Sequence, residues 1–408
     1  MRTVHRTLVL TLSATLVRFA SAGRAAAQTP NIRVAGRVQT QFSTASGDST
    51  ASFNPSAVVS STMEIRRLRF QADVRLGDNI NMALQPSFEM GALRMRDAYL
   101  RVVLWHNPAS GFGLTMGQEK KPFNRYELTS SNNLLSIERG ARFRGFSGAA
   151  AQNNLLEENG YLAHDLGASV DFTTWQNRFT LKAGLYNGSG ESSNDVNNAK
   201  TIAGRATATV LVDGENRPVL RLGAAVVSRD RSVTTAATGT TFSPDSSRRT
   251  SAIGLDAEWG DFRPGLHVIA DFASGKTLRS GTDCLNGTTA ISCRVDVGRN
   301  TANLRPNTPD SALATFRSFQ VVGGWRWQPD DPNGTRLVKI IEPALRLDYT
   351  DPNTSRDDDQ GMLITPVLSV YFAQTMVLRA GLDLYRYQDA TGASRSFRAF
   401  RVSWQANF

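Results

Sequence analysis

Apolar and polar side chains alternate along most of the chain, in stretches of about ten residues. In the stretch 31–42, Ile32 and Val38 share one parity, and Arg33 and Arg37 share the other. Successive side chains of a β-strand point to opposite faces, so each stretch predicts a strand with one apolar and one polar face. The 3.6-residue period that marks amphipathic helices is nearly absent.

Sixteen such segments are expected: 31–42, 63–76, 80–90, 93–105, 112–118, 163–174, 178–187, 201–211, 217–228, 250–259, 264–273, 316–328, 335–350, 362–372, 376–388 and 395–408. Tight connections such as 77–79 alternate with long ones such as 119–162 and 274–315. An even strand number, with short turns on one side and long loops on the other, is typical of bacterial outer-membrane barrels. The predicted fold class is therefore all-β, a transmembrane antiparallel β-barrel of 16 strands.

The aromatic residues are sorted along the predicted strands. All six tryptophans fall at the short-turn ends: Trp105, Trp175, Trp259, Trp325, Trp327 and Trp404. Four tyrosines, Tyr186, Tyr349, Tyr385 and Tyr387, lie near the long-loop ends. Because aromatic side chains gather at membrane–water interfaces, we expect a tryptophan girdle at one rim and a tyrosine girdle at the other. A soluble β-sandwich has no reason to sort its tryptophans in this way.

Charge fixes which face of each strand points inward. In the stretch 63–76, Arg67, Arg69 and Arg75 share one parity. Turning that parity outward would place three arginines in hydrocarbon, at roughly 2 to 4 kcal/mol each near the midplane. These arginines are therefore expected to face the lumen. Arg66 has the outward parity, and we expect it to reach the lipid headgroups near the long-loop end.

The predicted lumen has a basic wall and an acidic wall. The first two and last two strands, which become neighbours when the barrel closes, form the basic wall: Arg33, Arg37, Arg67, Arg69, Arg75, Arg379 and Arg401. Roughly opposite, Asp256, Glu258 and Asp271 are expected to point inward. Two such walls create a transverse field, and guanidinium groups offer planar donor forks to phosphate or carboxylate oxygens. We predict a moderate anion preference; the alternative is that these charges only pair and solvate.

The segment 119–162 is too long for an ordinary connection. It interleaves basic side chains with apolar anchors, and we interpret it as an infolded third loop that constricts the pore. Its candidate filter residues are Lys120, Lys121, Arg125, Arg139 and Arg142. The alternative is an ordinary solvent-exposed loop.

Composition and charge narrow the class of protein. The chain has 408 residues and a formal net charge of +10, and four of its arginines lie in residues 1–27, which contain no acidic residue. The remainder has 42 basic and 36 acidic residues, a net charge of 42 − 36 = +6. No run approaches the ~18 to 20 apolar residues of a spanning helix. These features exclude a helical membrane protein.

Residues 1–27 are predicted to be a signal peptide. Arg2 and Arg6 precede an apolar run at 8–17, and Ala25–Ala27 offers a small-residue cleavage site. A second possible site is Ala20–Ala22. The mature domain is then the barrel of residues 28–408, located in the outer membrane.

Several motifs resemble those of the phosphate-selective porin O and P family. They are Ile65–Phe70, Arg96–Leu100, Gly117–Phe123, Glu127–Ser131, Ile137–Arg139 and Tyr186–Gly190. The resemblance implies a sixteen-stranded trimeric channel for small anions such as phosphate. The terminal Phe408 is similar to the outer-membrane assembly signal, which implies the barrel-assembly machinery as a partner. Residues 140–162 depart from the family pattern.

The remaining chemistry is sparse. Cys284 and Cys293 lie in the long loop 274–315 of an exported chain, so we expect a disulfide between them. Asp357–Asp359 are interpreted as a solvated acidic loop, and no metal or cofactor is expected. His267 near Asp271 lacks the serine that a hydrolase would need, so no enzyme activity is expected. Basic residues inside a barrel also exclude nucleic-acid binding.

Three functions remain open. The first is passive diffusion of anions, with phosphate or polyphosphate as the substrate. The second is a general porin with weak selectivity. The third is a structural or adhesive barrel with a plugged lumen. The lipid bilayer and lipopolysaccharide are expected partners in each case.

Overall fold

The computed structural model describes residues 29–47, 61–89, 91–140, 142–143, 146–147, 151–193, 200–231, 248–277, 314–331, 334–355, 357, 360–373, 375–388 and 394–408. The predicted signal peptide 1–27 and the predicted disulfide partners Cys284 and Cys293 lie outside these residues. Within them, no helix has both the length and the apolar character needed to cross a membrane, a finding that says nothing of β-barrels.

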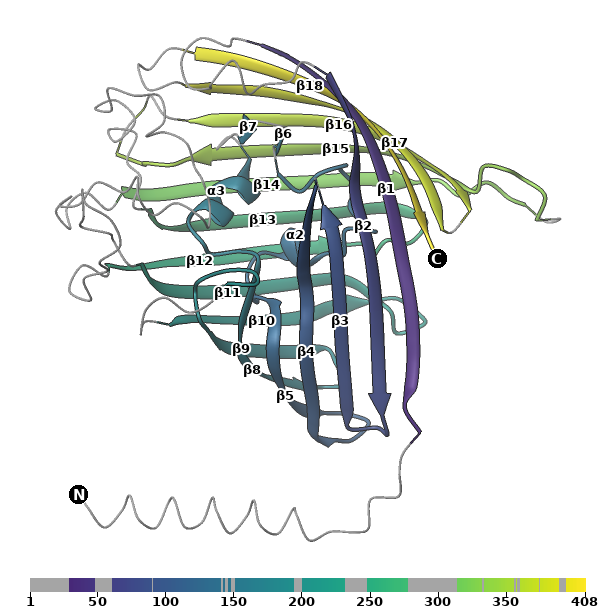
Figure 1. Ribbon diagram of the computed structural model, residues 1–408, viewed down its shortest axis with the longest axis vertical. Helices are drawn as coiled ribbons and strands as arrows, with labels where there is room; N and C mark the ends of the chain where they lie inside the picture. Colours follow the sequence, from purple (N-terminus) through teal and green to yellow (C-terminus); the bar gives the residue numbers. More distant parts are fainter. Residues whose placement is uncertain are drawn as a thin grey trace, which may run out of the picture.

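Sixteen antiparallel strands form a closed barrel (Figure 1). They are β1 (Asn31–Gly47), β2 (Ser61–Leu76), β3 (Ile80–Glu89), β4 (Ala92–His106), β5 (Gly111–Lys120), β8 (His164–Thr174), β9 (Phe179–Tyr186), β10 (Thr201–Val212), β11 (Pro218–Arg231), β12 (Arg248–Trp259), β13 (Gly265–Thr277), β14 (Ala314–Arg326), β15 (Ile340–Asp351), β16 (Gly361–Ala373), β17 (Met376–Gln388) and β18 (Ser394–Asn407). Each predicted strand is confirmed, and closure leaves no exposed sheet edge.

The barrel closes where the first strand meets the last. β1 pairs with β18 on one side and with β2 on the other. The β1–β18 and β1–β2 registers therefore bring together the inward faces of the strands predicted to form the basic wall. β5 pairs directly with β8, so the residues between these two strands are excluded from the barrel wall.

The outward face of the barrel is apolar. Val226 of β11 and Ile253 of β12 are register partners and are 57% and 54% exposed. Their chain neighbours Val227 and Ala252 point inward and are buried. An exposed apolar parity around a closed barrel is suited to hydrocarbon, because lipid rather than water covers it.

The tryptophans occupy the predicted rim, but the tyrosines do not. All six tryptophans are between 38% and 70% exposed at the short-turn ends of their strands. Tyr186 and Tyr385 instead point inward and are buried, so the prediction that they belong to a tyrosine girdle is wrong. The Tyr186 hydroxyl donates to Glu119 Oε1 over 3.0 Å, which satisfies it inside the barrel. Tyr349 is exposed, and the Tyr387 side chain lies outside the described part of the structure.

A β-bulge in β2 reverses one expectation. Gln39 of β1 pairs with Arg67, and the next residue, Thr40, pairs with Ile65. Arg66 is therefore an extra residue in β2, and both Arg66 and Arg67 are buried. The prediction that Arg66 reaches the lipid headgroups is wrong, because the bulge turns its side chain inward.

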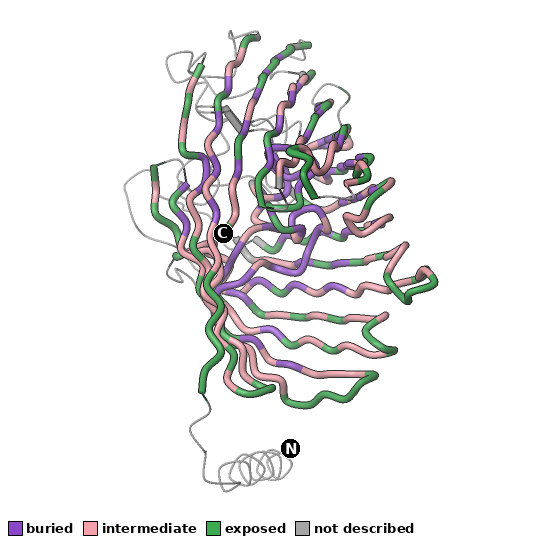
Figure 2. Tube along the Cα trace, turned by 90° about the vertical axis from the view of Figure 1, so that its right-hand side faces the viewer, coloured by how far each residue is buried: buried purple, intermediate pink, exposed green. Residues whose placement is uncertain are grey.

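Between β5 and β8 the described residues form four short elements: α2 (Arg125–Leu128), β6 (Arg142–Phe143), β7 (Phe146–Ser147) and α3 (Gln152–Glu158). Residues of α2 contact β13, and residues of α3 contact β14 and β15. Strand residues alternate in exposure, whereas this part of the chain has continuous buried runs such as 121–124 and 151–156 (Figure 2). The segment therefore packs against inward strand faces.

Candidate functional site

Residues 121–163, here called the inner segment, are fixed to one side of the barrel by apolar packing. One buried cluster joins apolar side chains of the segment to inward residues of β9 to β14: Phe123, Leu155, Leu156, Tyr161, Leu162, Tyr186, Ala203, Ala225, Val227, Ala252, Ala273 and Phe316. A second cluster joins Tyr126 and Leu135 to Ile269 and Val322 of the wall. Removal of this surface from water stabilises the segment in its position.

The acidic wall holds the segment by its charges. Arg125 donates from Nε and Nη2 to the two carboxylate oxygens of Glu258, at 2.7 and 2.9 Å. The backbone N–H groups of Arg125 and Tyr126 donate to Asp271 over 2.7 and 3.1 Å. These amides belong to the first turn of α2 and have no partner within the helix, so Asp271 satisfies them. Asp256 pairs with Arg205 of β10 at 2.7 Å rather than with the segment.

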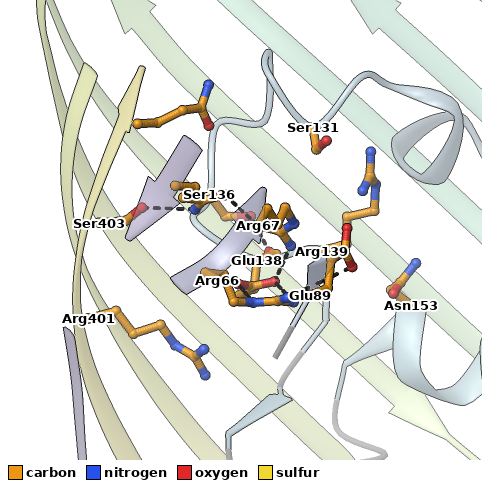
Figure 3. Close-up of polar contacts among 12 residues, drawn as sticks. Arg66, Arg67, Glu89, Ser131, Ser136, Glu138, Arg139, Asn153, Arg401 and Ser403 are labelled. Atoms are coloured by element: carbon orange, nitrogen blue, oxygen red, sulfur yellow. Dashed lines mark hydrogen bonds and ion pairs between the residues drawn. The ribbon is translucent and has the colours of Figure 1, made fainter. Parts of the chain in front are cut away.

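At the basic wall, one carboxylate of the same segment binds two arginines (Figure 3). Arg66 donates from Nε and Nη2 to the two oxygens of Glu138, at 2.6 and 2.8 Å. Arg67 Nη2 donates to Glu138 Oε2 over 2.6 Å, and its Nη1 donates to Gln39 over 2.8 Å. All three charged side chains are buried. The bulge in β2 allows two consecutive arginines to converge on one carboxylate.

Two further arginines of this wall are also paired. Arg69 Nε donates to Glu89 over 2.8 Å, and its Nη1 donates to Ser131 of the inner segment over 3.0 Å. Arg401 Nε donates to Asp383 over 2.8 Å. These contacts balance part of the wall's positive charge.

Arg37 and Arg379 differ from the other buried arginines of this wall. Arg37 donates to the side chain of Asn132 and, over 2.8 Å, to Ser131. Arg379 donates to the Asn132 carbonyl oxygen over 3.1 Å and to Gln405 over 3.4 Å. Both guanidinium groups thus converge on Asn132, and no described carboxylate forms an ion pair with either of them. Two buried positive charges remain uncompensated where the segment meets the wall.

The structure does not bring every predicted basic residue to this place. Arg33 and Arg75 are exposed near the short-turn ends of β1 and β2. Arg33 lies four residues before Arg37, which corresponds to about 13 Å along a strand. Arg33 and Arg75 therefore lie apart from the other predicted arginines of the basic wall, which lie together: Arg37, Arg67, Arg69, Arg379 and Arg401.

Three of the candidate filter residues are bound inside the segment or at its base, whereas Arg125 pairs with Glu258 of the wall. Lys120 lies 3.1 Å and Arg139 3.4 Å from Glu127 oxygens, and Lys121 pairs with Asp165 at 3.2 Å. Burial lowers the pKa of Lys121. Arg142 lies in β6, and its side chain is outside the described part of the structure.

Two carboxylates of the segment stay ionised in spite of their burial. Burial alone raises the pKa of Glu127, but Lys120 and Arg139 outweigh it and bring the pKa to about 2. Burial opposes ionisation of Glu138 in the same way, and Arg66 and Arg67 hold its pKa well below the usual range. Both carboxylates are therefore anionic at neutral pH.

Sequence reasoning missed the carboxylates that neutralise the basic wall. Glu138 and Glu89 are the main ones, and Arg66 was assigned to the wrong face. Two adjacent arginines inside one alternating strand were a usable signal, because a regular strand cannot turn both inward and a bulge can.

A scan of family models matches residues 32–253 to the phosphate-selective porin O and P family. The chain belongs to this family. The earlier resemblance is confirmed, and the porin is an outer-membrane β-barrel whose family and fold indicate a channel rather than an enzyme. None of the curated proteins compared with this porin matches it.

Solved structures with a similar fold include three bacterial outer-membrane proteins. The anion-selective porin from Comamonas acidovorans has a TM-score of 0.54 at 12% identity, covering 93% of this porin and 100% of its own chain. The outer membrane channel DcaP of Acinetobacter baumannii has a TM-score of 0.55 at 11% identity, covering 95% of this porin and 100% of its own chain. Salmonella typhi OmpF, in complex with daunomycin, has a TM-score of 0.53 at 10% identity, covering 92% of this porin and 97% of its own chain. At these identities the likeness shows the fold.

Proposed function

We propose that this porin forms a water-filled channel through which anions diffuse passively, with phosphate or polyphosphate as the preferred class. The observation that carries the proposal is the pair Arg37 and Arg379, buried and bonded only to neutral described partners. An uncompensated charge in a low-dielectric wall attracts counter-ions and repels cations.

The charge count of the basic wall supports the same proposal. Six inward arginines lie there: Arg37, Arg66, Arg67, Arg69, Arg379 and Arg401. Three carboxylates pair with them, Glu89, Glu138 and Asp383, and Glu64 has the inward parity in β2, which leaves 6 − 4 = +2. One of the three, Glu89, is also shared with Arg96 of β4. The local excess is therefore positive.

The remaining elements of the proposal concern the pathway and the assembly. The inner segment, which overlaps the predicted loop 119–162 over residues 121–162, would narrow the channel, because it meets both charged walls. Residues 1–27 would direct export, and Phe408 would be read by the barrel-assembly machinery. In the folded barrel Phe408 closes the β1–β18 seam through backbone hydrogen bonds with Gly36 of 2.7 and 3.0 Å. The porin would work as a homotrimer in contact with lipopolysaccharide.

Electrophysiology on the refolded porin tests this function. Single-channel conductance in planar bilayers is recorded in chloride, and inorganic phosphate is then titrated into one chamber. We expect phosphate to reduce chloride conductance with a saturable dependence. Large ohmic steps that are insensitive to phosphate would instead identify a general porin with weak selectivity.

A second candidate function is a structural or adhesive barrel with a filled lumen. The apolar packing of Phe123, Leu156 and Tyr161 against inward strand residues favours it, because dry contacts leave no water path at that place. The same recordings separate the two functions. The absence of any conductance from correctly folded protein would support the filled barrel.

A further inference from the structure

The Glu138 carboxylate lies in a donor fork of the kind that binds free oxyanions. Arg66 contributes two donors and Arg67 a third, all within 2.8 Å of a Glu138 oxygen. Bidentate guanidinium contacts of this geometry are how proteins recognise phosphate and carboxylate groups. The group that fills the fork here belongs to the protein itself (Figure 3).

The fork offers more donors than Glu138 uses. Arg66 Nη1 and Arg67 Nε are buried and have no hydrogen-bond partner among the described residues. Arg66 Nη1 comes only within 4.0 Å of a Glu89 oxygen. A carboxylate has two oxygens and a tetrahedral oxyanion has four, so phosphate can accept from donors that Glu138 leaves unsatisfied.

The backbone of the segment is held independently of this carboxylate. The carbonyl oxygen of Glu138 accepts from Arg346 Nη1 over 3.0 Å and from Ser136 Oγ over 2.6 Å. Rotation about the side-chain bonds of Glu138 is therefore enough to vacate the fork, and the segment does not have to leave the wall.

We propose that Arg66 and Arg67 form an oxyanion site for which Glu138 competes as an internal ligand. A tetrahedral oxyanion of the phosphate type displaces the Glu138 side chain while it passes, and the carboxylate returns as the anion leaves. The inference rests on the proposed function, since it assigns a competitor to the anion path of the same channel.

Competition of this kind suits conduction. A buried site with several free guanidinium donors would hold phosphate too tightly for rapid release, and passage requires binding that is favourable but brief. An internal carboxylate lowers the net affinity without removing the donors. Glu138 is thus a specificity-determining residue that sets how strongly phosphate is retained.

The test compares Glu138→Gln with Glu258→Gln. Each variant removes one buried negative charge that pairs the inner segment with the barrel wall, with two arginine partners at Glu138 and one segment partner at Glu258, but only the first removes the charge from the arginine fork. In planar bilayers we expect Glu138→Gln to lower the phosphate concentration that half-blocks chloride current about tenfold, the effect of one charge-assisted contact. For Glu258→Gln we expect less than about a twofold change, because that charge lies on the opposite wall.

Two further anions and a third variant extend the test. Sulfate should block Glu138→Gln as phosphate does, whereas nitrate, which is planar, should block it less. Glu138→Asp keeps the charge on a shorter side chain and should give a half-blocking concentration between those of the wild type and Glu138→Gln. It also serves if Glu138→Gln fails the heat-modifiability check of barrel folding on gels.

Equal phosphate block in the wild type and in both Glu138 variants would overturn the inference. So would an equal gain in Glu258→Gln, because the effect would then be one of bulk charge. A wild-type barrel that prefers cations contradicts the proposed function instead. The two failures are therefore distinguishable in the same recordings.

Discussion

The two charged walls of the barrel hold the inner segment in different ways. At the acidic wall Glu258 binds Arg125 and Asp271 binds the first amides of α2, and a large apolar cluster lies beside them. At the basic wall one carboxylate, Glu138, meets an excess of arginines, and Arg37 and Arg379 bind neutral groups. The acidic side thus serves as an anchor with its charges satisfied, whereas the basic side retains charge that can act on ions.

The largest loss of stability is expected from a substitution in the apolar part of the anchor. Leu156 is fully buried in the cluster, so Leu156→Ala should cost about 2 to 5 kcal/mol of the free energy of unfolding, as a core cavity does. Denaturant unfolding in lipid vesicles measures it. Leu255→Ala on the lipid face of β12 is the control, since lipid fills the space that it leaves. Equal losses in the two variants would contradict the anchoring role.

The charged part of the anchor should give a smaller effect. Arg125→Ala leaves the Glu258 carboxylate with Arg221 as its remaining arginine partner, and we expect about 1 to 2 kcal/mol less protection of the α2 and α3 amides from hydrogen exchange. Arg221→Ala is the matched control, because it removes the other arginine partner of Glu258 without touching the segment. If both variants loosen α2 equally, Arg125 is not the tether.

At the basic wall the expected effect is on ions rather than on stability. Replacing Arg37 and Arg379 together by Gln should lower the ratio of anion to cation permeability about five- to tenfold, as expected for two charges acting at close range. Replacing Arg33 and Arg75 by Gln removes the same charge at the exposed strand ends. That control should change the ratio about twofold at most, because salt screens exposed charges. An equal change in both double variants would mean that the buried position of Arg37 and Arg379 beside Asn132 does not affect ion selectivity.

The smallest effect on stability is expected when the pH is lowered. The folded pKa of Glu127, about 2, lies below the ordinary value of 4.5. Its contribution to stability is therefore complete above pH 4.5 and is lost progressively as the pH falls from there through about 2. The difference in free energy of unfolding between the wild type and Glu127→Gln should shrink over that window. A difference that stays constant, or grows as the pH falls, would rule out this ion cluster.

The barrel could be predicted because its pattern is local. Alternation with a period of two marks every strand, and arginines fix the parity wherever hydrocarbon would penalise them, as in β2. The sorting of the six tryptophans to one rim followed from the same pattern. For these features the sequence contains the physical reason directly.

The site could be predicted only in outline, because its contacts depend on the path of the inner segment. The inward parity of Arg67 and Glu258 is visible in the sequence, but their partners Glu138 and Arg125 come from a part of the chain without alternation. The bulge at Arg66 and the buried position of Tyr186 were missed for a related reason. Both are fixed by tertiary partners, Glu138 and Glu119, that lie far away in the sequence, although the two adjacent arginines were a local signal for the bulge.

The most direct test of the central claim is the zero-current potential of the wild-type porin in a KCl gradient. The uncompensated charge of Arg37 and Arg379 predicts a potential of the sign produced by chloride moving faster than potassium. It also predicts a shift towards zero when both arginines are replaced by Gln. A potential of the opposite sign, or one that the double replacement leaves unchanged, would contradict the claim.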